Sequence, residues 1–313
     1  MRCIRPLKAN LRKDGSVTFS SKDAIPGLVP FEIECRKCLP CRLNGAREKA
    51  IRAVHEAQIH EDNIFLTLTY APQHLTSPRL VYADWQGFMK RLRSHIDEKT
   101  HCQQKISCMV TGEYGEINKR PHWHALIFNF RPDDQKPLRE TPRGDHVYES
   151  ETLQRLWPFG ISEYGDVTID SANYTARYAA KKLVHGDDTE HDYHPIHRTS
   201  SKHAIGKRWI EKNYRHVLEN GFVVLPNGQT SKIPRYYVDW AKKYQPDLWL
   251  YYVTQVRPLI QKKAEAQSDK EWADYLEDVR AAIGKKPRPL TRSKVKETIL
   301  KSKFKVLQEN LKL

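Results

Sequence analysis

Two apolar segments separated by a short polar turn are the feature that most restricts how this sequence can fold. The first covers residues 105–114 (KISCMVTGEY) and the second covers residues 122–130 (HWHALIFNF). Strands this close in the chain pair as an antiparallel hairpin, because a short turn simply reverses the chain direction. The sequence therefore predicts an antiparallel sheet built around this hairpin.

Other periodic segments extend this expectation. Residues 63–70 (NIFLTLTY) alternate as a strand does, and a further strand is predicted over 160–169. Helical spacing predicts three helices before residue 190, at about 43–60, 82–99 and 170–185. Residues 1–41 and the Pro- and charge-rich segment after residue 130 are expected to be irregular. Asp170 or Ser171 is expected to cap the third helix.

The order of these elements indicates the fold class. Hairpin-linked strands interspersed with helices favour an α+β fold: a central antiparallel sheet of about five strands with helices on one side. We expect three regions: an N-terminal Cys-rich segment with a helix (1–60), a sheet-containing core (61–215) and a mainly helical basic region (216–313).

The charge of the chain points to a polyanionic partner. Lys and Arg exceed Asp and Glu by 53 to 38, a net charge of +15. Residues 284–313 alone carry ten Lys or Arg and two Glu. Such a run is either a solvated tail or an arm that follows phosphates. Nucleic acid is the leading candidate for the partner.

The sequence lacks an apolar run long enough for a membrane span and lacks a secretory signal. We therefore expect a cytoplasmic protein without a membrane partner. Disulfides are rare in that compartment, so clustered cysteines favour a metal.

Four cysteines form a candidate metal site. Cys35, Cys38 and Cys41 follow the pattern C-x2-C-x2-C, and Cys3 is available as a fourth ligand. Four thiolates would form a closed structural zinc site. An iron–sulfur cluster or reduced thiols are the alternatives. Cys102 and Cys108 have no partner motif and are expected to be ordinary thiols.

His122 and His124 head the second strand of the hairpin. Because strand side chains alternate, both imidazoles share one face. They form either a polar sheet edge or part of a metal site. Glu113 precedes His122 by nine residues and lies on the pairing strand. Two His and one carboxylate suit a divalent ion that also binds substrate oxygens. Glu116 falls in the turn and is the weaker candidate.

The helix predicted over 170–185 carries Tyr174, Tyr178 and Lys181 on one face, at spacings i, i+4 and i+7. Aromatic pairs at this spacing often serve only as core packing. Here the alanines of the helix offer the better core face, and a lysine does not suit a buried stripe. Phenol oxygens and an ammonium group suit chemistry on a phosphate.

Two other motifs have alternative interpretations. The segment HDYHPIH supplies His191, His194 and His197 as a rival metal site, and Pro195 favours a loop there. The segments KRWIEKNYR and IPRYYVDWAKKY interleave aromatic and basic residues. They are suited either to stacking on unpaired bases or to amphipathic helices with basic ends.

Three ordered motifs now resemble a known family. FLTLTY (65–70), HWHALIF (122–128) and YTARYAAKK (174–182) are similar to the motifs of the HUH endonuclease superfamily. The arrangement Y-x3-Y-x2-K resembles rolling-circle initiators of small single-stranded DNA phages. With CRKCLPC and TGEYGE, the likeness is greatest to replication initiators of gokushovirus-type microviruses. It covers about residues 35–185.

The resemblance implies specific roles. His122, His124 and Glu113 would bind Mg²⁺ or Mn²⁺, which polarises the scissile phosphate. Tyr174 or Tyr178 would attack phosphorus, leaving a 3′-hydroxyl and a 5′-phosphotyrosine. Two tyrosines would act alternately at a single-stranded origin, and Lys181 would neutralise phosphate charge.

The same resemblance implies partners. The phosphotyrosine conserves the bond energy, so ATP is not needed, and the sequence has no G-x-x-x-x-G-K-[ST] loop. A host helicase and polymerase in the bacterial cytoplasm would complete replication. The competing hypotheses are a transposase or relaxase of the same superfamily and a non-catalytic, zinc-stabilised DNA-binding regulator.

Overall fold

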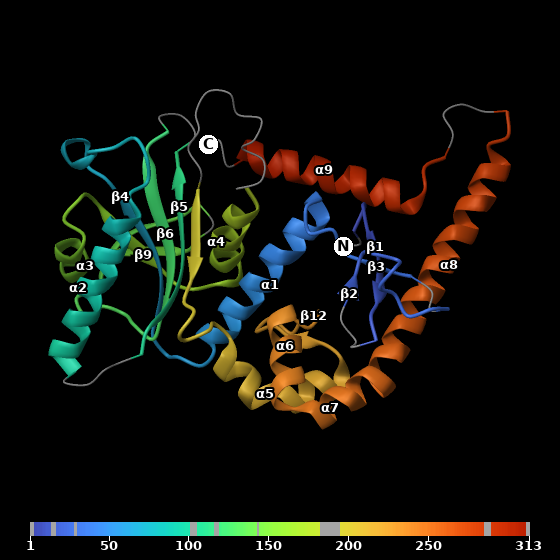
Figure 1. Cartoon of the computed structure of the whole chain (residues 1–313). Coiled ribbons are helices and arrows are strands. Elements are labelled where there is room, and N and C mark those ends of the chain that lie inside the picture. Colours follow the sequence, from blue (N-terminus) through green and yellow to red (C-terminus); the bar gives the residue numbers. More distant parts are fainter. Residues whose placement is uncertain are drawn as a thin grey trace. The chain divides into compact units, whose positions relative to one another are not determined.

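The computed structural model shown in Figure 1 describes residues 3–13, 17–27, 30–100, 105–115, 119–142, 144–181, 195–284 and 289–310. Within these ranges, the side chains of Leu11, Thr100, 177–181 and 304–310 are not described. The chain divides between Lys212 and Asn213 into two compact units. The predicted boundaries after residues 60 and 215 stay a prediction.

A seven-stranded antiparallel sheet forms the centre of the first unit, in the order β10-β5-β6-β4-β9-β8-β7. Its strands are β4 (Asn63–Thr69), β5 (Ser107–Tyr114), β6 (Pro121–Phe128), β7 (Lys136–Glu140), β8 (His146–Glu149), β9 (Ser162–Gly165) and β10 (Ile196–Thr199). The predicted hairpin is β5 and β6, whose register pairs Ser107 with Phe128 and Tyr114 with Pro121. The sheet is thus larger than the five strands expected.

The additional strands lie where the sequence predicted irregular structure. All five side chains of β7 are exposed, so that strand has no apolar alternation to reveal it. Strand β10 follows Pro195 in a segment expected to be a loop, and it pairs with β5 from far away in the chain. Both expectations were wrong because pairing partners distant in sequence leave no local pattern.

Helices cover both faces of the sheet, so the prediction of helices on one side was wrong. Helices α2 (Tyr82–Thr100) and α3 (Glu151–Leu156) pack on one face, and α1 (Leu39–Ala57) and α4 (Ile169–Lys181) pack on the other. The physical reason is visible in β5 and β6, where successive side chains are almost all buried. A strand buried on both faces requires cover on both.

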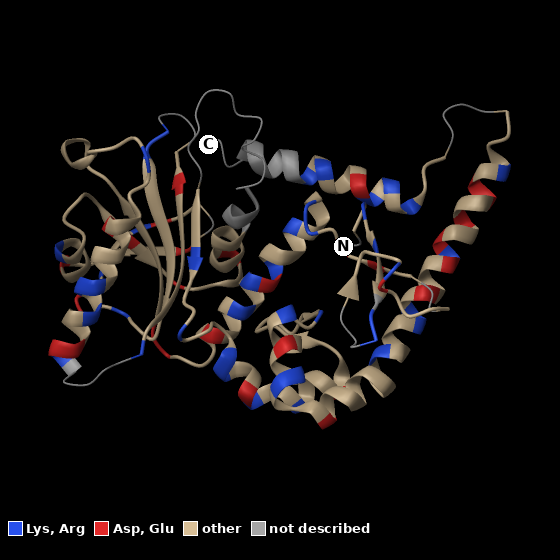
Figure 2. Ribbon diagram, viewed as in Figure 1, with Lys and Arg blue, Asp and Glu red and all other residues tan. Residues whose placement is uncertain are grey.

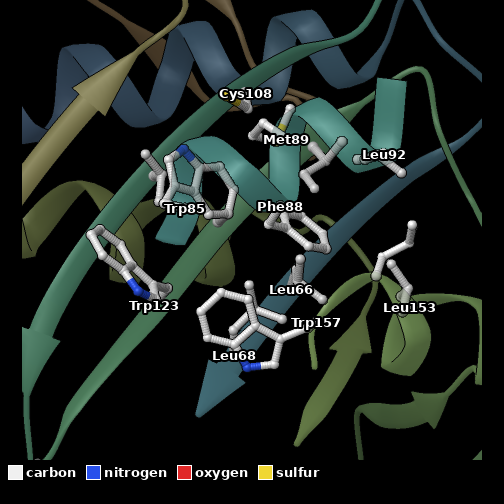
Figure 3. Close-up of a cluster of buried hydrophobic side chains, with 14 of the residues drawn as sticks. Leu66, Leu68, Trp85, Phe88, Met89, Leu92, Cys108, Trp123, Leu153 and Trp157 are labelled. Carbon is white, nitrogen blue, oxygen red and sulfur yellow. The ribbon is translucent and has the colours of Figure 1, made fainter. Parts of the chain in front are cut away.

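The core under α2 and α3 is rich in aromatic side chains. Figure 3 shows Trp85 and Phe88 of α2 above Leu66 and Leu68 of β4, with Trp123 of β6 and Trp157 beside them. The indole of Trp123 donates a hydrogen bond to the Tyr70 hydroxyl at 3.0 Å, which satisfies its buried polar atom. This core holds β4 and β6 rigidly from behind.

The opposite face is closed by two helices with small side chains. Ala46, Ala50 and Ala53 of α1 are buried against Ala172 and Ala176 of α4. The alanine stripe predicted for the helix near 43–60 is therefore confirmed. Alanines at such a contact allow the two helix backbones to approach closely, so α1 fixes the position of α4.

The N-terminal segment forms a small antiparallel sheet of β1 (Leu7–Leu11), β2 (Val17–Thr18) and β3 (Phe31–Ile33), in the order β2-β1-β3. The expectation that residues 1–41 are irregular was wrong. These strands contain two to five residues each, which is too short for a periodic pattern to emerge. The 3₁₀ turn η1 (Pro72–His74) follows β4.

The second unit is mainly helical in the residues described. Helix α5 (Lys207–Asn220) leads from the first unit into it. It contains β11 (Val223–Val224), β12 (Thr230–Ser231), α6 (Arg235–Tyr244), α7 (Pro246–Tyr251), the π-helical turn η3 (Tyr252–Val256), α8 (Arg257–Ala281) and α9 (Arg292–Asn310). Tyr237 and Trp240 of α6 are buried, which favours the amphipathic-helix interpretation of that segment over base stacking.

Basic and acidic side chains alternate along α8 and α9 (Figure 2). Glu297 forms ion pairs with Lys294 at 3.2 Å and with Lys301 at 2.6 Å. Part of the basic charge in this region is therefore balanced within the unit. Across the described ranges, no helix combines the length and apolar character that crossing a bilayer requires.

Candidate active site

The register of three central strands places the predicted ligands together. Glu113 of β5 lies directly opposite His122 of β6, and Thr111 lies opposite His124. On the other side of β6, Thr67 of β4 pairs with His124. Because these positions alternate with the apolar core residues, all of these side chains emerge on the face covered by α4.

The Glu113 carboxylate joins the two imidazoles. Its Oε1 lies 3.0 Å from Nε2 of His122 and 3.0 Å from Nε2 of His124. Burial by itself would raise the pKa of Glu113, but hydrogen bonds with His122 and His124 outweigh it and hold that pKa below its ordinary value. Burial lowers the pKa of His124, although its bond to Glu113 opposes the change. Glu116, the weaker candidate, lies outside the described residues.

The second ring nitrogen of each histidine also has a partner. Nδ1 of His122 lies 3.1 Å from the carbonyl oxygen of Arg120, and Nδ1 of His124 lies 3.0 Å from the hydroxyl of Thr67. Sequence reasoning missed Thr67 as a functional residue. Its position on the same face of the FLTLTY strand was the available signal, but a threonine on a strand is too common to indicate a role.

The donor set fits a divalent cation. A carbonyl oxygen only accepts, so His122 must carry a proton on Nδ1, which leaves the lone pair of a neutral ring on Nε2. The Thr67 hydroxyl can accept the corresponding proton of His124. Two Nε2 lone pairs and a carboxylate oxygen then converge, with all three atoms within 4.8 Å of one another. Two imidazoles and a carboxylate that leave positions open suit a metal that also binds substrate.

Tyr174 brings its hydroxyl to this group. The phenol oxygen lies 3.4 Å from Oε1 of Glu113 and 3.4 Å from Nε2 of His124. The tyrosine ring meets the His124 ring edge-on at 5.1 Å and packs against Phe65 at 6.0 Å. A strand face and a helix therefore place a nucleophilic oxygen and three ligand atoms at one point.

The start of α4 is held by a reciprocal cap. The Thr168 hydroxyl accepts from the amide of Ser171 at 3.1 Å, and the Ser171 hydroxyl accepts from the amide of Thr168 at 2.8 Å. The cap is therefore Thr168, and the prediction of Asp170 or Ser171 was wrong by two or three positions. This arrangement is a capping box with serine in place of the usual glutamate. It fixes the first turn of the helix that carries Tyr174.

A further bond ties α4 to the sheet beside the candidate site. The Thr111 hydroxyl donates to the carbonyl of Thr175 at 3.1 Å and lies 2.8 Å from Nδ1 of His197. Both threonines are buried. His197 lies on β10 in this arrangement, so it belongs to the support of α4; His191 and His194 lie outside the described residues.

The remaining predicted side chains have limited description. Tyr178 and Lys181 belong to α4, but their side chains lie outside the described part of the structure, as does all of Lys182. Their roles stay predictions that rest on helical periodicity.

The four predicted cysteine ligands also come together. Ligand atoms of Cys3, Cys35, Cys38 and Cys41 all lie within 4.8 Å of one another. The four sulfurs are free rather than joined in disulfides. Cys108 is buried elsewhere in the first unit and accepts a weak hydrogen bond from Ser200 at 3.7 Å, and Cys102 lies outside the described residues.

Comparisons with known proteins agree with this geometry. Residues 63–183 match a family model of replication-associated proteins of the ORF2 type. The chain is 53% identical to replication-associated protein VP4 of Bdellovibrio phage phiMH2K, over 100% of both chains. It is 30% identical to replication-associated protein ORF2 of Spiroplasma virus 4, over 93% of this chain and 98% of the relative. No solved structure matches it.

Proposed function

We propose, since this chain belongs to the family of replication-associated proteins of gokushovirus-type microviruses, that it starts rolling-circle replication by nicking and rejoining single-stranded DNA. The family establishes a role in the replication of viral DNA. The proposal adds the chemistry: a tyrosine attacks the origin strand and keeps its 5′ end covalently attached.

One observation carries the proposal. The Tyr174 hydroxyl lies 3.4 Å from both a carboxylate oxygen and an imidazole nitrogen of a group suited to a divalent cation. A tyrosine that only filled the core would not direct its oxygen at these atoms. Mg²⁺ or Mn²⁺, when bound by His122, His124 and Glu113, supplies Lewis-acid polarisation of the scissile phosphate.

The step balances without an outside energy source. The Tyr174 oxygen forms a bond to phosphorus while the bond from phosphorus to the 3′-oxygen breaks. The phenol proton is lost and the departing 3′-oxygen gains one, so the products are a 3′-hydroxyl and a 5′-phosphotyrosine. The reverse reaction with a new 3′-hydroxyl rejoins the strand. Glu113 and His124 are the groups near enough to the phenol to accept its proton.

The second tyrosine and the lysine complete the proposed cycle. Tyr178 follows Tyr174 by one helical turn, so each could hold a 5′ end while the other cuts the regenerated origin. Lys181 would offset phosphate charge on the same face. The free 3′-hydroxyl would serve a host polymerase, and a host helicase would separate the strands in the bacterial cytoplasm.

The decisive experiment looks for the covalent intermediate. The full-length protein is incubated with Mn²⁺ and single strands bearing the origin, and adducts that survive denaturant are quantified. We expect the Tyr174→Phe, Tyr178→Phe double variant to form none. Tyr148→Phe is the matched control, because it removes a phenol hydroxyl from β8 of the same sheet and should leave adduct formation unchanged.

The outcomes separate the competing functions. Tight binding of the strand without an adduct under any divalent metal would favour a non-catalytic regulator and refute the proposal. An adduct that persists in the double variant would place the nucleophile elsewhere. An adduct that requires a hairpin from a mobile element in place of the origin would favour a transposase or relaxase.

A further inference from the structure

Four cysteine sulfurs converge at the beginning of α1, far along the chain from one another. Cys3 precedes β1, Cys35 follows β3, and Cys38 and Cys41 lie at the start of α1. The Sγ atoms of Cys3 and Cys38 are 3.8 Å apart. Cys41 is buried, and the other three are partly buried. The fold of the small N-terminal sheet therefore returns Cys3 to a motif more than thirty residues later.

The backbone around these sulfurs is arranged to stabilise thiolates. The amide of Cys35 donates to the sulfur of Cys3 at 3.4 Å, and the amide of Cys38 donates to the sulfur of Cys35 at 3.4 Å. Arg36, between them, has a φ of 57°. A left-handed conformation at a residue other than glycine is costly and persists where its surroundings demand it. Here it turns the chain back over the sulfur of Cys35.

We propose that Cys3, Cys35, Cys38 and Cys41 bind one Zn²⁺ ion as a closed structural site. Tetrahedral Zn–S bonds of about 2.3 Å place neighbouring sulfurs about 3.8 Å apart, which is the separation found between Cys3 and Cys38. A disulfide would require about 2.05 Å. A four-iron cluster would spread the sulfurs further, since each thiolate then binds a different iron.

The end of α1 is a suitable place for this charge. Cys38 is the N-cap of α1, its side chain makes no capping hydrogen bond, and the first turn contains no acidic residue. Zn²⁺ with four thiolates carries a net charge of −2. Negative charge at a helix N-terminus is stabilising, so the metal would complete an end that the side chains leave without a negative charge.

The proposed ion would act on the architecture of the candidate active site. It would join the strands β1 and β3 to the start of α1. Helix α1 packs through its alanines on α4, and α4 carries Tyr174. Four protein ligands leave no open position for substrate. Its role is therefore structural, and it would hold the helix that supports the nucleophile.

The experiment measures metal content in the full-length protein, purified without a histidine tag. Inductively coupled plasma mass spectrometry should find about one zinc ion per chain. The variant Cys35→Ser, Cys38→Ser should lose this zinc. Cys108→Ser is the matched control, because Cys108 is buried in the first unit away from the cluster. It should keep the full amount.

A second pair of measurements keeps the proposal open to refutation even if the cysteine variants fail to fold. Zinc should remain in a His122→Ala, His124→Ala variant, because the imidazoles do not contribute to this site. In the wild-type chain, titration with a mercurial reagent should release zinc in step with modification of four thiols. Zinc that disappears with the histidines, zinc that stays after the thiols react, or iron in place of zinc would each overturn the proposal.

Discussion

The hydroxyl of Thr67 offers the sharpest test of how the candidate metal site works. It lies 3.0 Å from Nδ1 of His124, a ring that is almost fully buried. A metal bound at Nε2 requires the ring proton at Nδ1, and Thr67 is the acceptor that holds it there. Thr67→Val keeps the shape of the side chain but replaces this oxygen with a methyl group.

The expected loss can be estimated from this contact. Without an acceptor, a buried N–H costs about 1 to 3 kcal/mol, and the ring avoids that cost by moving its proton to Nε2, where the metal must bind. Removing such an outer partner typically weakens metal affinity by about 10- to 100-fold, equivalent to about 1.4 to 2.7 kcal/mol. We therefore expect Thr67→Val to need about 10 to 100 times more Mn²⁺ for half-maximal adduct formation.

Thr69→Val is the matched control for this variant. Thr69 lies on the same strand and the same face, opposite His122, but its hydroxyl bonds to the carbonyl of Ile161 at 3.4 Å instead of to a ring. Isothermal titration with Mn²⁺ and adduct yield against Mn²⁺ concentration provide the two readouts. The reasoning is refuted if Thr67→Val binds Mn²⁺ as wild type does, if excess Mn²⁺ fails to restore its yield, or if Thr69→Val is equally impaired.

Three further predictions concern stability. Thr111→Val removes the donor to the Thr175 carbonyl and should lower the free energy of unfolding by about 1 to 3 kcal/mol in urea titrations; a loss below about 0.5 kcal/mol would mean that this bond does not hold α4. Glu56→Ala removes a buried carboxylate that accepts from a backbone amide at 2.7 Å, so it should cost about 3 kcal/mol, whereas exposed Glu61→Ala should cost little. Burial lowers the pKa of His124 below 6.5, so unfolded chains bind the extra proton first. Metal-free protein should then lose stability as the pH falls from 6.5 through the folded-state pKa, and His124→Ala should flatten this slope in denaturation at several pH values.

The sequence contains enough local information to predict the centre of the sheet. Strands β4, β5 and β6 alternate clearly, and one short turn joins β5 to β6, so the pairing of Glu113 with His122 follows from counting along a hairpin. The alanine stripe of α1 was equally readable, because its helical spacing is regular. These features depend on residues close together in the chain.

The features that escaped prediction depend on residues far apart. The pairing of β10 with β5 places His197 beside Thr111, and this contact links positions 86 residues apart. Likewise, helices on both faces of the sheet follow from total burial of β5 and β6, which an apolar run alone does not distinguish from a strand covered on one face. Thr67 and Thr111 were missed because their hydroxyls gain meaning only from the groups opposite them.

The two candidate metal groups differ in chemistry, and this difference explains how one chain could use two metals. Thiolates are soft ligands that select zinc, whereas two imidazoles and a carboxylate also accept Mg²⁺ or Mn²⁺. The cysteines close around their ion, but the Glu113 group lies beside a phenol and has room for substrate oxygens. Zinc binds most mixed nitrogen and oxygen sites more tightly than Mn²⁺ does. Metal supply, rather than intrinsic affinity, must therefore decide which ion occupies the open site, while four thiolates retain zinc where it supports α1.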